Sequence, residues 1–168
     1  MKNSAWNIAI KWGAIYALLT LIWLPLESLA GLHDDYVKYR VLLTNLKYIP
    51  AFLIFFAALR SSRETAPDGE YPYSRAFTDG LRLTAISTLF SIPAQYISLR
   101  YLASDFLSQM QQAMTEGLWM TSAEAEQYFE FQSYFIQSIL AIPATGLMIT
   151  AIVALFVSRN SRAYERNG

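Results

Sequence analysis

The chain contains no cysteine, one histidine and few charged side chains. Without cysteine it can form neither a disulfide nor a thiolate nucleophile nor a cysteine-ligated metal centre. Charged residues make up 15% of the 168 residues, whereas a typical soluble domain has about 25%. The 13 basic and 13 acidic side chains cancel, so no net field favours nucleic acid as a partner. Because 54% of the residues are hydrophobic, the composition indicates an integral membrane protein.

Motifs that carry chemistry are also missing. The sequence has no glycine-rich phosphate loop, no HExxH motif and no pair of carboxylates inside an apolar stretch, and such patterns mark nucleotide-binding and proteolytic sites. The one histidine, His33, has only Asp34 and Asp35 beside it, which is too few ligands for a metal site. The sequence therefore predicts no catalytic residue, no metal and no cofactor, and we expect that the protein is not an enzyme.

Four apolar stretches cover most of the chain, and each contains one proline: Pro25, Pro50, Pro93 and Pro143. A hydrocarbon core of about 30 Å requires roughly 20 mostly apolar residues in a helix, because only a helix or a closed barrel satisfies its own backbone hydrogen bonds there. The pattern predicts an all-α fold, in which a single domain over residues 1–168 forms an integral membrane four-helix bundle. The predicted spans are about 12–32, 41–59, 83–103 and 135–157.

The first two predicted spans each have to tolerate a charged residue. Lys11 and Glu27 bracket 15 uncharged residues, and Lys47 and Arg60 bracket 12. In an antiparallel hairpin of these two helices Glu27 and Lys47 lie at similar depth, where an ion pair would offset much of the cost of burying either charge. The alternative is that Lys47 extends its ammonium group to the lipid headgroups. Both interpretations stay open.

The first span also has features of a secretory signal peptide, because basic residues precede it and Ser28-Leu29-Ala30 loosely resembles a cleavage site. Its apolar run is as long as that class allows, and Trp6 and Ile8 lie where a signal peptide is polar. We therefore expect residues 1–30 to be retained as a membrane span.

Basic residues gather on one side of the predicted bundle. Because lysine and arginine are retained on the cytoplasmic side, the side with nine of them is assigned to the cytoplasm: Lys2, Lys11, Arg60, Arg63, Arg75, Arg82, Arg159, Arg162 and Arg166. The other side has four: Lys38, Arg40, Lys47 and Arg100. This asymmetry predicts a multi-pass protein of the bacterial cytoplasmic (inner) membrane with both termini in the cytoplasm. The acidic segment of residues 103–132 then faces outward.

Helical patterning continues beyond the third and fourth spans. An apolar stripe recurs on one helix face: Phe106, Met110, Ala113 and Met114. Gly117 can end that helix in the left-handed conformation, and Thr121 to Glu124 has the spacing of a capping box that starts the next helix. We expect helices 3 and 4 to extend into an extramembrane helical hairpin. Its tip, residues 118–120, is either self-packed or a docking surface for a partner.

Five polar residues within or beside the spans are candidate functional residues: Glu27, Lys47, Asp79, Gln95 and Gln137. Polar groups inside a membrane bundle mark substrate or ion pathways when they meet in a cavity. Asp79 lies near the cytoplasmic start of the third helix, where a structural role is the simpler interpretation and proton uptake the functional one. The fourth span also carries a ridge of small residues that can join helices within one chain or between chains: Gly146, Thr150 and Ala154.

Four segments carry distinctive short motifs. They are Ala9-Ile10-Lys11-Trp12-Gly13, the stretch from Tyr73 to Leu81, the stretch from Met110 to Glu126, and the stretch from Gly146 to Val157. Together they resemble the domain of unknown function 4199 family, an uncharacterised group of four-span membrane proteins found widely among Bacteroidota. The resemblance implies a four-span fold and a membrane location, and it implies no reaction. One departure is the turn Gly117-Leu118-Trp119-Met120-Thr121, where that family often has a compact Gly-Met-Ser turn.

Three classes of function follow from these observations, of which an enzyme has the least support. The first is a small non-catalytic membrane protein that contacts the lipid bilayer and packs with itself as a homo-oligomer or with another membrane protein. The alternative is a small transporter or channel-like subunit in which Glu27, Lys47, Gln95 and Gln137 line one cavity. The location of these four side chains discriminates between the two non-enzymatic classes.

Overall fold

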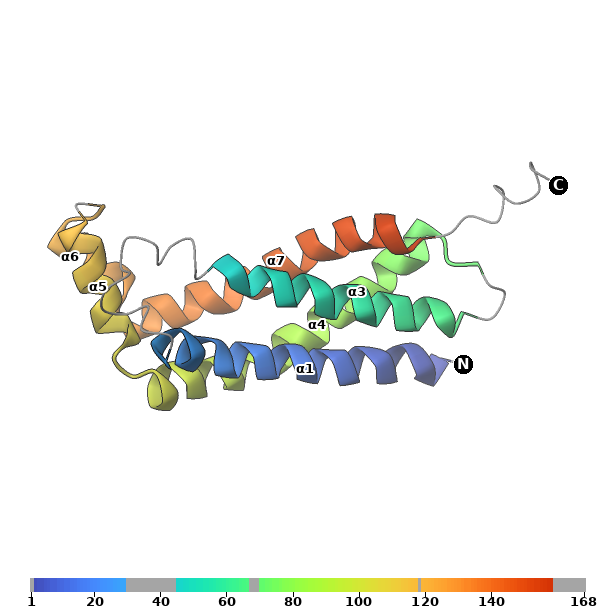
Figure 1. Ribbon diagram of the computed structural model, residues 1–168, viewed down its shortest axis with the longest axis horizontal. Coiled ribbons are helices and arrows are strands. Elements are labelled where there is room, and N and C mark those ends of the chain that lie inside the picture. Colours follow the sequence, from blue (N-terminus) through green and yellow to red (C-terminus); the bar gives the residue numbers. More distant parts are fainter. Residues whose placement is uncertain (1, 30–44, 67–69, 118, 159–168) are drawn as a thin grey trace.

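The computed structural model describes residues 2–29, 45–66, 70–117 and 119–158, and it is helical throughout these ranges apart from short connections. The elements are, in chain order, α1 (Lys2–Leu29), η2 (Asn45–Lys47), α3 (Tyr48–Glu64), α4 (Tyr73–Ile97), η3 (Ser98–Leu102), α5 (Phe106–Glu116), α6 (Ser122–Tyr128) and α7 (Phe131–Val157). The long helices α1, α3, α4 and α7 run along one another, and α5 and α6 lie at one end of the bundle (Figure 1). The start of α1 and the end of α7 lie at the opposite end. The predicted all-α fold is confirmed.

Two of the described helices are long and apolar enough to cross a membrane. They are α1, through the 24 residues Ser4–Glu27, and α7, through the 27 residues Phe131–Val157. Helix α3 has 17 residues, which at 1.5 Å per residue gives about 26 Å, near the lower limit for a span. Helix α4 has 25 residues but carries Arg75, Asp79 and Arg82 in its first turns. Membrane association is therefore supported by α1 and α7, and four complete crossings stay a prediction.

The core lies between the four long helices. Phe55 of α3 is fully buried, and its ring meets that of Tyr16 of α1 edge-on, with the ring centroids 5.8 Å apart. Leu83 of α4 and Val153 of α7 belong to the same cluster. The outward faces of these helices also carry large apolar side chains, among them Leu18, Leu53, Leu89 and Leu155. Helices that are apolar on both faces are typical of a membrane environment.

Helices α4 and α7 approach each other closely because small residues line both. A Cβ atom added at Gly80 of α4 would lie 2.3 Å from Cγ2 of Thr150, and one added at Gly146 of α7 would lie 2.7 Å from Cγ2 of Thr84. The hydroxyl oxygens of Thr84 and Thr150 are 3.3 Å apart, and Ala154 is buried one turn further along α7. The ridge of Gly146, Thr150 and Ala154 therefore joins two helices of the same chain.

The third predicted helix does not continue unbroken into the hairpin. After α4 the chain makes one π-helical turn, in which the Ala103 amide donates a 2.8 Å hydrogen bond to the Ser98 carbonyl, and a new helix begins at Phe106. The break turns α5 across the end of the bundle (Figure 1). Phe106 can then pack with Leu24 of α1 and Leu99 of η3 in a second buried cluster.

The fourth predicted helix is interrupted as well, between α6 and α7. Glu130 has an extended ψ of 139°, so the helical path stops before it and restarts at Phe131. Phe129, the residue before the break, is buried and its ring stacks on that of Tyr134 at a centroid distance of 5.7 Å. Burial of this ring fixes the position of the break against α7.

The turn between α5 and α6 agrees with the sequence in one respect and differs in another. The capping box is confirmed, because the Thr121 hydroxyl accepts a hydrogen bond from the Glu124 amide and the Glu124 carboxylate accepts one from the Thr121 amide at 2.9 Å. The left-handed conformation expected at Gly117 is wrong, since its φ is −73°. An added Cβ at Gly117 would lie 2.5 Å from Cδ1 of Trp119, but that ring is exposed and can turn aside.

Candidate functional site

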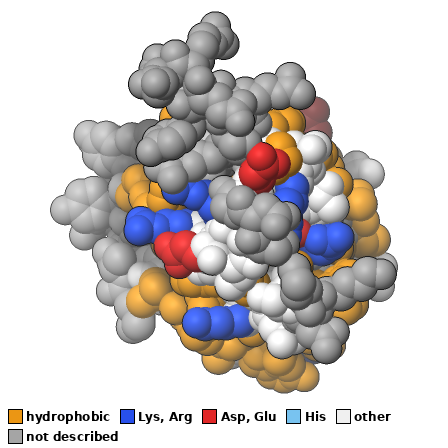
Figure 2. Space-filling model, turned by 90° about the vertical axis from the view of Figure 1, so that its right-hand side faces the viewer, with side chains coloured by type: hydrophobic (Ala, Val, Ile, Leu, Met, Phe, Trp, Pro, Cys, Tyr) orange, Lys and Arg blue, Asp and Glu red, His pale blue; other side chains and the backbone are white. Residues whose placement is uncertain are grey.

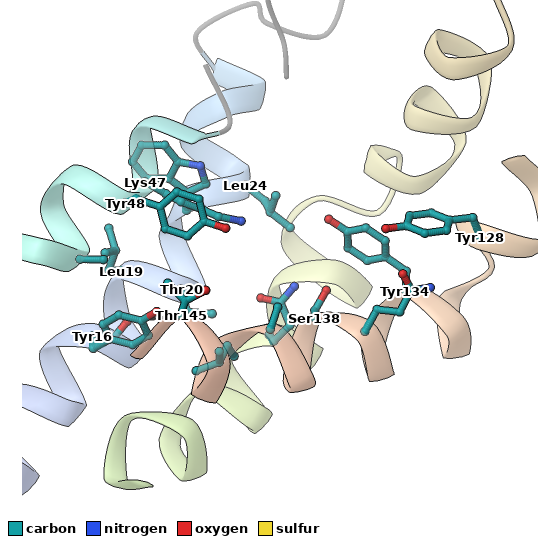
Figure 3. A pocket seen from close by; sticks show the side chains of 16 residues that line it. Tyr16, Leu19, Thr20, Leu24, Lys47, Tyr48, Tyr128, Tyr134, Ser138 and Thr145 are labelled. Atoms are coloured by element: carbon teal, nitrogen blue, oxygen red, sulfur yellow. Dashed lines mark hydrogen bonds between the residues drawn. The ribbon is translucent and has the colours of Figure 1, made fainter. Parts of the chain in front are cut away.

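A cavity of about 220 Å³ lies near the α5–α6 end of the bundle, between α1, α3, α4, α6 and α7 (Figure 3). At about 30 Å³ per water molecule it has room for roughly seven waters. It is smaller than the pockets of about 300 to 1,000 Å³ that hold drug-sized ligands. Part of its wall is apolar and is formed by Leu19, Leu24, Ala51, Ala141 and Ile142.

Three of the candidate polar residues converge on this cavity: Lys47, Gln95 and Gln137. Lys47 is the last residue of η2, Gln95 lies in the final turn of α4, and Gln137 lies near the start of α7. Segments far apart in the sequence thus bring the three side chains to one place. Hydroxyl groups of three further residues line the same space: Thr20, Ser138 and Thr145.

Lys47 supplies the charge of the site, because it is the one charged side chain among the described residues that line the cavity. Its Nζ lies 5.5 Å from the centroid of the Tyr48 ring, within range of a cation–π interaction. The ion pairs of the described residues join Arg60 to Glu64 and Arg82 to Asp79, so neither involves Lys47. An ammonium group that has no carboxylate partner among the described residues can attract anions, and it does so strongly where solvent is restricted.

Gln95 supplies a buried amide. Its side chain is 9% exposed and lines the cavity, yet it makes no hydrogen bond to any other residue of the described ranges. The Gln95 amide atoms are not among the enclosed side-chain atoms that lack a partner, so they reach the open space of the cavity, where water or a ligand can be their hydrogen-bond partner. Gln137, across the cavity on α7, offers a second amide.

Five aromatic side chains also line the cavity: Tyr16, Trp23, Tyr48, Tyr128 and Tyr134. In Figure 3 the hydroxyl groups of Tyr128 and Tyr134 point toward the side of the cavity where Lys47 and Tyr48 lie. Rings of this kind present an apolar face and a polar tip. The cavity therefore has surfaces for both the apolar and the polar part of a small molecule.

Glu27 lies just outside the cavity, one helical turn beyond Trp23. Its carboxylate is 3% exposed and accepts a hydrogen bond from Nε1 of Trp23. The direct ion pair with Lys47 that matched depth allows is not formed within the described part of the chain. The indole of Trp23, which lines the cavity, lies beside Glu27 instead.

Asp79 lies at the opposite end of the bundle and takes no part in the cavity. Its carboxylate accepts hydrogen bonds from the Tyr71 hydroxyl at 2.9 Å and from Nη1 of Arg82 at 2.5 Å. Tyr71 is 0% exposed, and its burial and the adjacent negative charge of Asp79 both raise the pKa of the tyrosine hydroxyl. These bonds hold the start of α4 against the segment that precedes it. The structural interpretation of Asp79 is therefore favoured over proton uptake.

Two features of the site were not identified from the sequence. The aromatic lining gave no signal, because its members come from α1, α3, α6 and α7 at no fixed spacing. The second feature, a buried stripe of small residues on α4 against which other helices pack, does have a sequence signal. The stripe consists of Ala76, Gly80, Thr84, Ser87, Ser91, Ala94 and Ser98. These residues recur every three or four positions, which is the spacing of a helix-packing seam.

The chemistry available at the cavity is binding. It combines one ammonium group, two amides and several hydroxyl groups with an apolar wall, so it can hold and orient a small molecule. In the residues that the structure describes, no group of three or more His, Cys, Asp or Glu side chains is placed to hold a metal ion.

Comparison with known proteins agrees with the resemblance seen in the sequence motifs. No curated protein and no solved structure matches the chain. A family model described as a protein of unknown function (DUF4199) matches residues 11–159. The match runs from within α1 to just beyond the end of α7 and includes every residue of the cavity wall. The chain therefore belongs to the DUF4199 family.

Proposed function

We propose that the protein is a small, non-catalytic, multi-pass protein of the bacterial cytoplasmic membrane that binds a small molecule in the cavity of its helix bundle. The observation that carries the proposal is the convergence of Lys47, Gln95 and Gln137 on one cavity. Polar groups that serve only helix packing find partners within the bundle. Their convergence on open space therefore favours a role in binding or transport.

Four membrane crossings, by α1, α3, α4 and α7, are part of the proposal. Helix α3 exposes Ile49 and Leu53, and α4 exposes Leu89 and Ile92. Large apolar side chains on outward faces are costly in water, at about 25 cal/mol per Å², and they are favourable in lipid. The exposed faces of the two shorter or more polar helices thus support the same environment as α1 and α7.

Both termini are proposed to lie in the cytoplasm. Arg60, Arg63, Arg75 and Arg82 belong to the ends of α3 and α4 that lie beside the start of α1 (Figure 1). Figure 2 shows Lys and Arg side chains on this end of the molecule, with hydrophobic side chains around them. The opposite end carries acidic residues: Asp105, Glu116, Glu124, Glu126 and Glu130. The retention of basic residues on the cytoplasmic side supports an outer location for the cavity.

A role in packing alone has less support. It would use the ridge of Gly146, Thr150 and Ala154 to bind a second copy or another membrane protein. Helix α4 of the same chain covers this ridge. We therefore propose the lipid bilayer as the partner of the outer faces and a small molecule as the partner of the cavity.

Thiol accessibility in lipid tests the proposal. The chain has no cysteine, so the single variants Ser138→Cys and Leu140→Cys place two probes on α7. Ser138 lines the cavity, whereas Leu140 is 65% exposed on the outer face of the helix. In proteoliposomes a charged methanethiosulfonate reagent should label residue 138 about tenfold faster than residue 140, because both the reagent and the reacting thiolate need water.

Two results would contradict the proposal. Slow labelling at both positions would mean that the cavity is closed to water and to ligands. Fast labelling at position 140 would mean that the outer face of α7 is not covered by lipid.

A further inference from the structure

The charge and shape of the cavity indicate which class of molecule it holds. We propose that it binds a small organic monoanion, in which one carboxylate is attached to a short aromatic or apolar body. This inference rests on the proposed function of the cavity and adds the chemistry of the ligand.

The charge follows from the residues of the wall. Lys47 is cationic, and no aspartate or glutamate is among the described residues that line the cavity. A cationic ligand would be repelled by the Lys47 ammonium group. A dianion would bring a second negative charge into a confined site where the described lining residues offer no second cation, so the desolvation cost of that charge would not be balanced. A single negative charge matches the site.

The hydrogen-bonding groups fit a carboxylate. The amide of Gln95 is nine-tenths buried and lacks a partner among the described residues, and its NH₂ group can donate to a carboxylate oxygen. The amide of Gln137 and the hydroxyl of Ser138 line the same space. Hydrogen bonds to an ionised acceptor are about twice as strong as those between neutral groups, so the carboxylate satisfies both Lys47 and the buried amide.

The remaining wall fits a small apolar body. Tyr16, Tyr48 and Tyr134 offer ring faces, and Leu19 and Ile142 offer aliphatic surface. The volume of about 220 Å³ is below the range of drug-sized ligands, so a single-ring or short-chain acid fits and a two-chain lipid does not. An anionic lipid headgroup also carries a negative charge, so the experiment has to distinguish a free carboxylate from a lipid headgroup.

Benzoate and its neutral isostere benzamide are suitable probes. Isothermal titration calorimetry on the full chain in phosphatidylcholine nanodiscs should give a dissociation constant for benzoate about tenfold lower than that for benzamide. Lys47→Met should remove this preference while benzamide still binds, and Lys47→Arg should keep it. Lys11→Met is the matched control, because Lys11 lies beside Trp12 of α1 and away from the cavity, and it should leave the preference unchanged. Gln95→Leu should weaken benzoate binding severalfold.

Several results would overturn the inference. Equal affinities of the wild-type chain for the two probes, or a preference that survives Lys47→Met, would exclude Lys47 as the anion-binding group. If Lys47→Met binds neither probe, Lys47→Arg becomes the deciding variant. Loss of the preference for benzoate over benzamide in Lys47→Arg would then contradict the inference. Loss of benzoate binding in phosphatidylglycerol nanodiscs would assign the site to a lipid headgroup. Failure of both probes to bind a protein that is labelled rapidly at position 138 would reject the ligand class and leave the proposed function intact.

Discussion

Replacing Gly80 with alanine should destabilise the helix bundle at the contact between α4 and α7. The added Cβ would lie 2.3 Å from Cγ2 and 2.8 Å from Oγ1 of Thr150. Thr150 is 0% exposed, and its β-branched side chain is restricted mainly to two χ1 rotamers in a helix. The Thr150 side chain therefore has little room to move away from the added methyl group, and α4 and α7 have to separate.

The expected size of the effect follows from two opposing contributions. Overpacking of a well-packed core costs about 1 to 3 kcal/mol, and a contact this short with a rigid neighbour belongs in the upper half of that range. Alanine gains about 1 kcal/mol over glycine from helix propensity. The free energy of unfolding should therefore fall by about 1 to 2 kcal/mol, which lowers Tm by roughly 2 to 8 °C for a chain of this size.

The purified protein is heated in detergent, and size-exclusion chromatography of each heated sample measures the folded fraction and hence the shift in Tm. The second variant of a double-mutant cycle is Thr150→Ala, which removes Cγ2 and Oγ1 and leaves the Thr150 Cβ at 3.0 Å, so Gly80→Ala should cost much less in that background than in the wild type. Gly117→Ala is the matched control. Gly117 has a helical φ of −73°, and its added Cβ would meet the exposed ring of Trp119, which can turn aside, and the Ala113 carbonyl oxygen at 3.1 Å, so its cost should be smaller than that at Gly80.

An unchanged Tm in Gly80→Ala would refute the reasoning, because it would mean that α4 and α7 do not approach through these residues. So would a loss of stability that persists in full when Thr150 is also replaced by alanine.

Three further predictions concern polar contacts. Tyr71→Phe should lower the free energy of unfolding by about 1 kcal/mol, because it removes the 2.9 Å hydrogen bond to Asp79; no change in Tm would show that the bond contributes nothing. Hydrogen bonds from the N-cap residue of α6 lower the pKa of Glu124 below 4.5, so its stabilisation of α6 should be complete above about pH 4.5 and be lost as the pH falls through the lower folded pKa. Hydrogen exchange of the α6 amides, corrected for intrinsic rates, should show this loss, and pH-independent protection would contradict it. The variants Glu27→Gln and Lys47→Met should have additive effects on Tm, since no direct ion pair joins the two residues, and a large coupling in the double variant would contradict that geometry.

Local and compositional features of this fold could be predicted from the sequence. The capping box of Thr121 and Glu124 needs only four consecutive residues, so its spacing is sufficient to identify it. The long apolar helices follow from the hydropathy of continuous stretches, as α7 illustrates. The ridge of Gly146, Thr150 and Ala154 was recognisable as a packing surface because its residues share one helix face.

Features that depend on contacts between distant segments could not be predicted. The π-helical turn after α4 exists because it lets Phe106 pack with Leu24 of a different helix, and no local pattern encodes that contact. The sequence names Glu27, Lys47, Gln95 and Gln137 as the lining of one cavity only as an alternative, because their meeting depends on the register of separate segments, and three of the four line the cavity. The sequence does not identify the partner of the Gly146 ridge for the same reason, and in the fold Thr84 of α4 lies against it.

The central claim is that the chain crosses the membrane four times with the cavity at the outer end, and site-directed labelling in intact cells tests it most directly. Single cysteines at Ser74, which is exposed at the start of α4, and at Ser122, which is exposed at the start of α6, report on the two ends of the bundle, and a cysteine at His33 reports on the segment between α1 and η2. An impermeant thiol reagent should label residues 33 and 122 in intact cells and residue 74 only after permeabilisation. Labelling of residue 74 without residue 122 in intact cells would reverse the orientation, and equal labelling of both would contradict the crossing by α4.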